Sequence, residues 1–276
     1  MTYYNLDANK DIPTLSDSIN NFYLDIAMGK VPGIKYALLS GKNPGIDPQD
    51  PVVSVDIWSM ANEVPKVNYP VNNIAVTIFV SSTNISDIGQ SIIIEGLAAG
   101  YVEQTGVAIT NGQNQVEVKD LLGNSITFLR FFTAQNLGAT NLAGDLYVAE
   151  SDTLVAGKPI ELTTIYSKIF IGDDRSFDAI YTIPAGKVGN ATLVNFAVAR
   201  GRDALLETFI KFEGGIPLKT NSFPIFQAFV APPIMPAIPL LIPEKVDLIF
   251  STQVNNIDTS VTARADFIII DQELLA

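Results

Sequence analysis

The chain has 276 residues with 29 Asp plus Glu against 17 Lys plus Arg, a formal net charge of -12. It contains no cysteine and no histidine, which excludes disulfides, metal sites built on Cys or His, and nucleophiles activated by an imidazole. The acidic balance argues against binding to nucleic acid, because neutralising phosphates takes clustered Lys and Arg. Hydrophobic residues make up 47% and charged residues 17%, so we expect a folded subunit whose charge-poor surface meets neighbouring subunits.

Residues 1–50 are predicted to form an N-terminal arm. One short amphipathic helix is expected at residues 19–27, where Phe22, Tyr23 and Ile26 lie on one face. It is shorter than the roughly 12 residues that an isolated helix needs, and a Pro- and Gly-rich stretch follows it. We therefore expect the arm to fold onto another surface, with these three side chains at an interface. The first residues lack a basic region followed by an apolar run, so no signal peptide is expected.

Residues 51–160 are expected to form a first β-sandwich domain. Short β-branched runs alternate here with Asn, Ser, Gly and Pro, the pattern of strands joined by turns. The expected strands are 52–58, 74–80, 91–97, 104–109, 115–119, 128–132 and 146–149. Asn111-Gly112 is suited to a tight hairpin turn. Regular short strands with turns between them are typical of a sandwich or a barrel.

Two side chains of this first domain are assigned to an interface. Trp58 is the only tryptophan, and we favour a buried anchor over a platform that stacks on a sugar. Arg130 lies within the aromatic run FLRFF. It either makes a cation-π contact or meets an acid across a subunit boundary, and the sequence leaves both readings open.

Residues 161–276 are expected to form a second, jelly-roll-like β-sandwich. A turn cluster at Gly157-Lys158-Pro159 indicates the junction between the two domains. The expected strands are 169–171, 177–183, 191–199, 207–212, 246–251 and 259–270. In the last of them alternate residues share one face: Val261, Ala263, Ala265, Phe267 and Ile269.

Residues 220–243 carry no charge and are long enough to cross a bilayer of about 30 Å. Their six prolines exclude a spanning helix, because each costs about 3 kcal/mol inside a helix. We expect an extended apolar segment that lies in a groove of its own domain or of a neighbouring subunit. Its predicted interface residues are Phe223, Phe226, Phe229, Ile234 and Met235.

Carboxylates are the remaining candidates for chemistry. Asp173, Asp174 and Asp178 could offer oxygen ligands to a cation, but they lack the ligand spacing of a dedicated calcium loop, so a solvated hairpin is favoured. Glu150 and Asp152 could form an acid/base pair of the glycosidase type, yet two acids on a strand end are more often a solvated rim. We expect no catalytic residues, no cofactor and no bound metal.

Several segments, taken in order, resemble a family of virion structural proteins of tailed bacteriophages, especially phages of marine bacteria. The resemblance covers residues 29–271 and rests on the order and spacing of six segments, which read GKVPGIKYALLSGKNPGID with the following Asp56-Ile57-Trp58, VSSTNISDIGQSIIIEGLAAGYVEQTGVAITNGQNQVEV, FLRFFTAQNLGATNLAGDLYV, DAIYTIPAGKVGNATL, LIPEKVDLIF and FIIID. The sequence departs from the family at Ala98-Ala99-Gly100, where an acid is common. The resemblance implies a β-rich component of the virion, on the head, neck or tail, and not an enzyme.

We therefore expect a structural subunit of a tailed-phage virion, such as a capsid decoration, a head fibre or a neck or tail component. It would assemble with copies of itself as a trimer or ring, and dock on major capsid, portal or tail proteins through its arm and its proline-rich segment, with no nucleic-acid or membrane partner. The alternative is a receptor- or glycan-binding fibre tip, for which Tyr101, Tyr147 and Tyr166 are the available aromatic residues. A depolymerase or glycosidase that uses only carboxylates ranks third.

Overall fold

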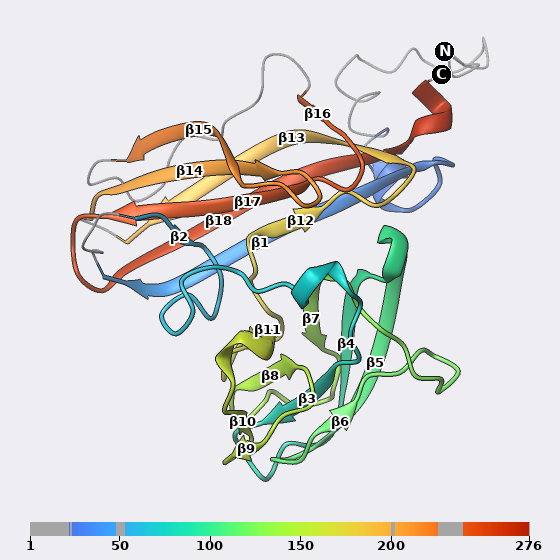
Figure 1. The fold of residues 1–276 in the computed structure, drawn as a ribbon, viewed down its shortest axis with the longest axis vertical. Coiled ribbons are helices and arrows are strands. Elements are labelled where there is room, and N and C mark those ends of the chain that lie inside the picture. Colours follow the sequence, from blue (N-terminus) through green and yellow to red (C-terminus); the bar gives the residue numbers. More distant parts are fainter. Residues whose placement is uncertain (1–21, 23, 48–52, 200–201, 226–239, 276) are drawn as a thin grey trace, which may run out of the picture.

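The computed structural model describes residues 22, 24–47, 53–199, 202–225 and 240–275, which form two stacked bodies of β-strands (Figure 1). Outside the strands, residues 24–27 form a helical turn. Short 3₁₀ segments lie at Val71–Asn73, Ala99–Tyr101, Leu162–Thr164 and Gln272–Leu275. The predicted all-β class with sandwich-like pairs of sheets is confirmed.

The larger body is a sandwich of two antiparallel sheets. One sheet has the order β1 (Ile34–Ile46), β18 (Thr259–Asp271), β13 (Lys187–Val198) and β16 (Leu240–Ile242). The other has the order β12 (Ile180–Thr182), β17 (Asp247–Val254), β14 (Ala204–Lys211) and β15 (Leu218–Ile225), and β2 (Val55–Asp56) adds to β17. Counted along the chain, β1 and β12–β18 are strands one to eight, and the two sheets read 1-8-3-6 and 2-7-4-5. That is the strand order of a jelly roll, the eight-stranded double sheet built from two Greek keys.

The jelly-roll core fills the space between these two sheets. Val261, Ala263, Ala265, Phe267 and Ile269 of β18 are all buried in it, as their alternation in the sequence predicts. The facing sheet supplies Leu206, Leu248 and Phe250, among others, to the same core. The apolar period of two therefore places one face of β18 in the core, whereas β17 of the facing sheet is buried on both faces.

The smaller body is a second sandwich. Its sheets are β11 (Ile165–Ile169), β8 (Leu146–Ala149), β3 (Phe79–Ser82) and β6 (Val116–Glu117), and β5 (Glu103–Asn111), β4 (Ile88–Leu97) and β7 (Arg130–Asn136). Its core includes a stack of three rings in which Phe131 lies 5.6 Å from Phe128 and 4.7 Å from Tyr166, centre to centre. The turn expected at Asn111-Gly112 is present, and the backbone of Gly112 adopts the left-handed conformation there. The strand after the turn, β6, pairs with β3.

The predicted arm requires correction, because part of it is a strand of the jelly roll. β1 pairs with β18 from Ile34↔Ile270 to Ile46↔Thr259. Its glycines and proline indicated irregular chain, but at Gly41 the reason for glycine is a close approach. A Cβ there would lie 2.2 Å from the Ala179 Cβ and 2.4 Å from the Ile57 carbonyl oxygen. Residues 34–46 of the predicted arm are therefore the first strand of the jelly roll.

The strand pairings also differ from the predicted boundary between the two domains at residue 160. β11 lies beyond that point and pairs with β8 of the small sandwich. The turn at Gly157-Lys158-Pro159 instead closes a local hairpin between β9 (Leu154–Val155) and β10 (Lys158–Pro159). In sequence the whole small sandwich thus lies between the first and second strands of the jelly roll.

Among the described residues, no helix is long and apolar enough to cross a membrane. The proline-rich segment begins in β15 and ends just beyond β16, at edges of the two jelly-roll sheets. Phe226, Phe229, Ile234 and Met235 lie outside the described residues, as does Tyr23.

Candidate functional site at the joint between the sandwiches

Arg130 links the small sandwich to the jelly roll. It begins β7, and its Nε donates to Oδ1 of Asp247 at the start of β17, at 3.2 Å. The two side chains are only 4% and 3% exposed. The Thr182 hydroxyl donates to the same carboxylate oxygen at 2.7 Å, and Nη1 of Arg130 donates to the Leu129 carbonyl at 2.9 Å. The buried pair is thus held by further hydrogen bonds, the condition under which a buried charge is tolerated.

Two tyrosine rings complete the surroundings of Arg130. Its guanidinium carbon lies 4.4 Å from the centre of the Tyr69 ring and 5.4 Å from that of Tyr101. Burial raises the pKa of both phenols. The cation-π reading is therefore correct, and the acid that Arg130 meets belongs to the same chain rather than to a neighbouring subunit.

A second buried carboxylate lies near the joint, just before β12. Asp178 accepts hydrogen bonds from the Ser59 hydroxyl at 3.1 Å and the Ser167 hydroxyl at 2.5 Å, with Ser176 as a further hydroxyl donor. No cation pairs with it among the described residues, and the residue is only 3% exposed. Burial therefore raises its pKa to about 6, against the lowering effect of the serines.

We predict that Asp178→Asn changes how stability depends on pH. The folded-state pKa of about 6 lies above the unfolded value of 3.8, so between about pH 4 and 6 the folded state binds more protons. Stability should fall as pH rises through this window by up to about 3 kcal/mol, since each pKa unit corresponds to about 1.4 kcal/mol. Urea unfolding at pH 4, 5, 6 and 7 should show this decline reduced in the variant. Parallel pH profiles for the two proteins would contradict the assignment.

The other predicted metal candidates do not converge with Asp178. Asp173 forms an ion pair with Lys42 at 2.9 Å. The backbone carbonyl of Asp174 accepts a hydrogen bond from the backbone amide of Asn136 at 2.8 Å. Within the described ranges there is no group of three His, Cys, Asp or Glu that could hold a metal ion.

Several predicted interface residues lie inside their own chain. Trp58 is fully buried in the jelly-roll core and donates from its indole nitrogen to the Val64 carbonyl at 3.0 Å, so the buried-anchor reading is correct. Ile26 is 2% exposed, and Phe223 packs on Phe196 with ring centres 6.2 Å apart. Phe22 is half-buried. As folded, Trp58, Ile26 and Arg130 are not accessible to a second chain, which corrects their assignment.

The residues considered for carbohydrate chemistry also have structural roles. Glu150 accepts the Tyr166 hydroxyl, and Asp152 accepts backbone amides of Thr153 at 2.6 Å and Glu161 at 2.7 Å. Tyr101, Tyr147 and Tyr166 are each at most 3% exposed. Buried rings cannot stack on a sugar, so these tyrosines do not support the glycan-binding alternative.

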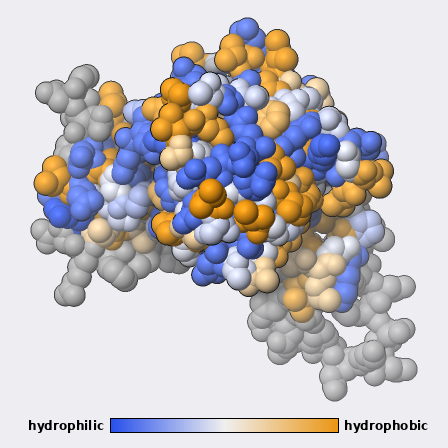
Figure 2. Space-filling model, turned by 90° about the horizontal axis from the view of Figure 1, so that it is seen from below, coloured by the Kyte–Doolittle hydropathy of each residue, from blue (hydrophilic) through white to orange (hydrophobic). Residues whose placement is uncertain are grey.

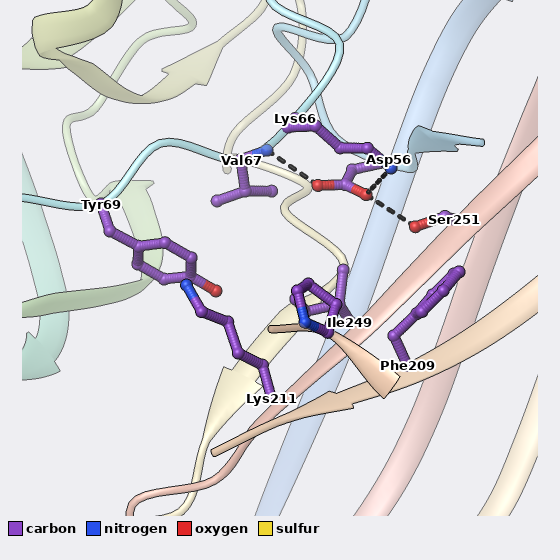
Figure 3. Close-up of a pocket in the computed structure, with 9 residues that line it drawn as sticks. Asp56, Lys66, Val67, Tyr69, Phe209, Lys211, Ile249 and Ser251 are labelled. Carbon is purple, nitrogen blue, oxygen red and sulfur yellow. Dashed lines mark hydrogen bonds and ion pairs between the residues drawn. The ribbon is translucent and has the colours of Figure 1, made fainter. Parts of the chain in front are cut away.

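The structure contains a pocket that the sequence does not predict. It lies between the outer face of the β14–β17 part of the sheet and the chain that follows β2 (Figure 3). Asp56, Lys66, Tyr69 and Lys211 line it. The only signal in the sequence was an acid inside an apolar strand, and nothing local indicated that residues about 150 positions apart would meet there.

The fold thus defines a jelly roll with a second sandwich inserted after its first strand. No protein family and no curated protein matches this chain. Among solved structures, the chain is similar to that of the Gx strain of infectious bursal disease virus, with 10% identity and a TM-score of 0.23 over 86% of this chain and 72% of the other. The structure of the Gt strain of this virus has 9% identity and a TM-score of 0.20 over 90% of this chain and 77% of the other. The VP2 subviral particle of the same virus has 9% identity and a TM-score of 0.18 over 75% of this chain and 73% of the other.

Proposed function

We propose that this chain is a non-enzymatic structural subunit of a virus particle, and specifically of a tailed-phage virion. The observation that carries the proposal is the jelly-roll strand order, 1-8-3-6 and 2-7-4-5, with a whole sandwich inserted between strands one and two. Jelly rolls build viral capsids and also lectins. A fold alone does not assign a function, so the site decides between these uses. The burial of the candidate tyrosines disfavours the lectin use.

The sequence resemblance to phage structural proteins supports the same assignment. The net charge of -12 favours a place away from packaged DNA, on the outside of the head or on the tail. We infer that copies of the chain assemble as a trimer or ring and contact other virion proteins through the residues before β1 and the segment 220–243.

Edge strand β15 offers one geometry for such a contact. Among the described strands it pairs only with β14, and most of its side chains with described burial are exposed. An unpaired strand edge can accept a strand from another chain through main-chain hydrogen bonds. The segment 226–239 follows this edge directly in the sequence.

The small sandwich would project from the assembled jelly rolls. Viewed from its end, its surface intersperses apolar and hydrophilic side chains (Figure 2). One turn there is held rigidly by the Asp120 side chain, which accepts the amides of Leu122 and Asn124, both at 2.8 Å. Leu121 and Leu122 are 79% and 86% exposed on this turn. Two exposed leucines on a fixed turn suit a contact with another virion protein.

Two measurements test the proposed function together. Sedimentation equilibrium of the purified chain should give a closed oligomer. Cryo-electron microscopy of the purified particle should place the jelly-roll body in contact with its copies. A monomer at all concentrations that is absent from purified particles would refute the proposal.

A further inference from the structure

The pocket beside Asp56 combines apolar walls with a positive charge. Its volume is about 230 Å³, and its lining comprises Asp56, Lys66, Val67, Tyr69, Phe209, Lys211, Pro217, Ile249 and Ser251. Figure 3 shows the Tyr69 ring and the Lys211 side chain on one side, with Asp56 and Ser251 on the other. The pocket borders the joint through Tyr69, whose ring also contacts Arg130, but the proposed assembly does not use this space.

The charges in the pocket do not cancel. Asp56 is fully occupied, since it accepts from Lys66 Nζ at 3.1 Å, the Val67 amide at 2.9 Å and the Ser251 hydroxyl at 2.6 Å. Lys211 has no carboxylate within 4 Å among the described residues, and its ammonium lies 4.9 Å from the centre of the Tyr69 ring. Two lysines and one aspartate give the pocket a net charge of +1, in a chain whose overall charge is -12.

The Tyr69 hydroxyl is a second group without a partner. Its oxygen is buried and makes no hydrogen bond within the described part of the chain. Leaving such a group unpaired is unfavourable, so an acceptor that reaches it gains affinity. Burial also raises the pKa of this phenol well above its usual value, which keeps the hydroxyl protonated and able to donate.

We propose that this pocket binds a carboxylate attached to a small apolar group. The Lys211 ammonium and the Tyr69 hydroxyl would donate to the carboxylate, and Phe209, Pro217 and Ile249 would enclose the apolar part. A single excess positive charge matches a carboxylate better than a doubly charged phosphate. The carboxylate could belong to a free organic acid or to an acidic side chain of a second copy, and the two sources share this chemistry.

Benzoate is the probe that tests the proposal, with the full chain in isothermal titration calorimetry. We expect benzoate to bind and benzamide, which has the same shape without the charge, to bind at least tenfold more weakly. Tyr69→Phe and Lys211→Met should each weaken benzoate about tenfold, the ratio that about 1.4 kcal/mol of a lost charge-assisted hydrogen bond gives. Lys119→Gln removes an exposed lysine on the small sandwich and serves as the control with unchanged affinity.

Tyr69→Phe separates binding from folding. Because the hydroxyl has no partner in the described chain, its removal should leave the urea midpoint equal or slightly higher while benzoate affinity falls. Equal binding of benzoate and benzamide, unchanged affinity in Tyr69→Phe, or no benzoate binding at millimolar concentration would overturn the proposal.

Sedimentation in the presence of benzoate distinguishes the two sources. If a second copy supplies the carboxylate, benzoate and Lys211→Met should both shift the chain toward smaller species. If the natural ligand is a free acid, the mass should stay unchanged while benzoate still binds. Either result supports the carboxylate site, and its success or failure is independent of the proposed role in a virion.

Discussion

Arg130→Met should destabilise the protein by about 3–5 kcal/mol, because it would leave Asp247 as a buried charge without its partner. The pair is 4% and 3% exposed and joins the two sandwiches, so its loss should affect the whole molecule. Urea unfolding followed by circular dichroism measures the change. Lys35→Met is the matched control, since Lys35 and Glu103 also connect the jelly roll with the small sandwich but are 60% and 32% exposed. An exposed pair of this kind should cost at most about 1 kcal/mol.

The double variant that combines Arg130→Met with Asp247→Asn should recover part of the stability that Arg130→Met alone loses. Neutralising Asp247 removes the unpaired buried charge and leaves an amide that the Thr182 hydroxyl can still reach. An Arg130→Met protein that unfolds at the wild-type urea midpoint would contradict the role of this pair at the joint.

Trp58→Ala should cost a similar amount, about 3–5 kcal/mol, through the cavity that it leaves in the jelly-roll core. The side chain is 0% exposed, and the Val64 carbonyl would also lose the hydrogen bond from the indole nitrogen. Thermal and urea unfolding followed by far-ultraviolet circular dichroism are suitable, because the variant has no tryptophan left to report by fluorescence.

Two further variants make the Trp58 result specific. Trp58→Phe keeps most of the apolar volume and should lose less stability than Trp58→Ala. Phe212→Ala removes an aromatic ring that is 45% exposed, so its effect should be smaller than that of Trp58→Ala. Equal losses in Phe212→Ala and Trp58→Ala would show that Trp58 does not anchor the core.

Two kinds of local signal predict strands here. β18 spans Thr259–Asp271 and has an apolar period of two, and its predicted face is buried. β8 occupies the expected residues 146–149 and is a short continuous apolar run that is buried on both faces. The sequence does not predict β1, because Pro32, Gly33, Pro44, Gly45 and Pro48 indicate the irregular chain of an arm. The strand is stabilised by its pairing with β18, more than 200 residues away, and such a partner leaves no local signal.

The candidate site was predicted only in part. The sequence left Arg130 with two readings, and the structure combines a cation-π contact with an acid that lies 117 positions away in the chain. Trp58 and Ile26 have the apolar character of interface residues, but apolar character alone does not distinguish an interface from a core.

The sequence by itself determined an all-β fold, because strand periodicity is a property of neighbouring residues, and it excluded chemistry that needs His or Cys. It also determined the acidic charge and the apolar, proline-rich character of residues 220–243. Only the tertiary structure decided that β1 completes the jelly roll, that Arg130 meets Asp247, and that Tyr69 and Lys211 share a pocket. Each of these depends on pairing and packing between segments that are distant in the sequence. Such contacts stabilise the protein only after folding has brought the segments together.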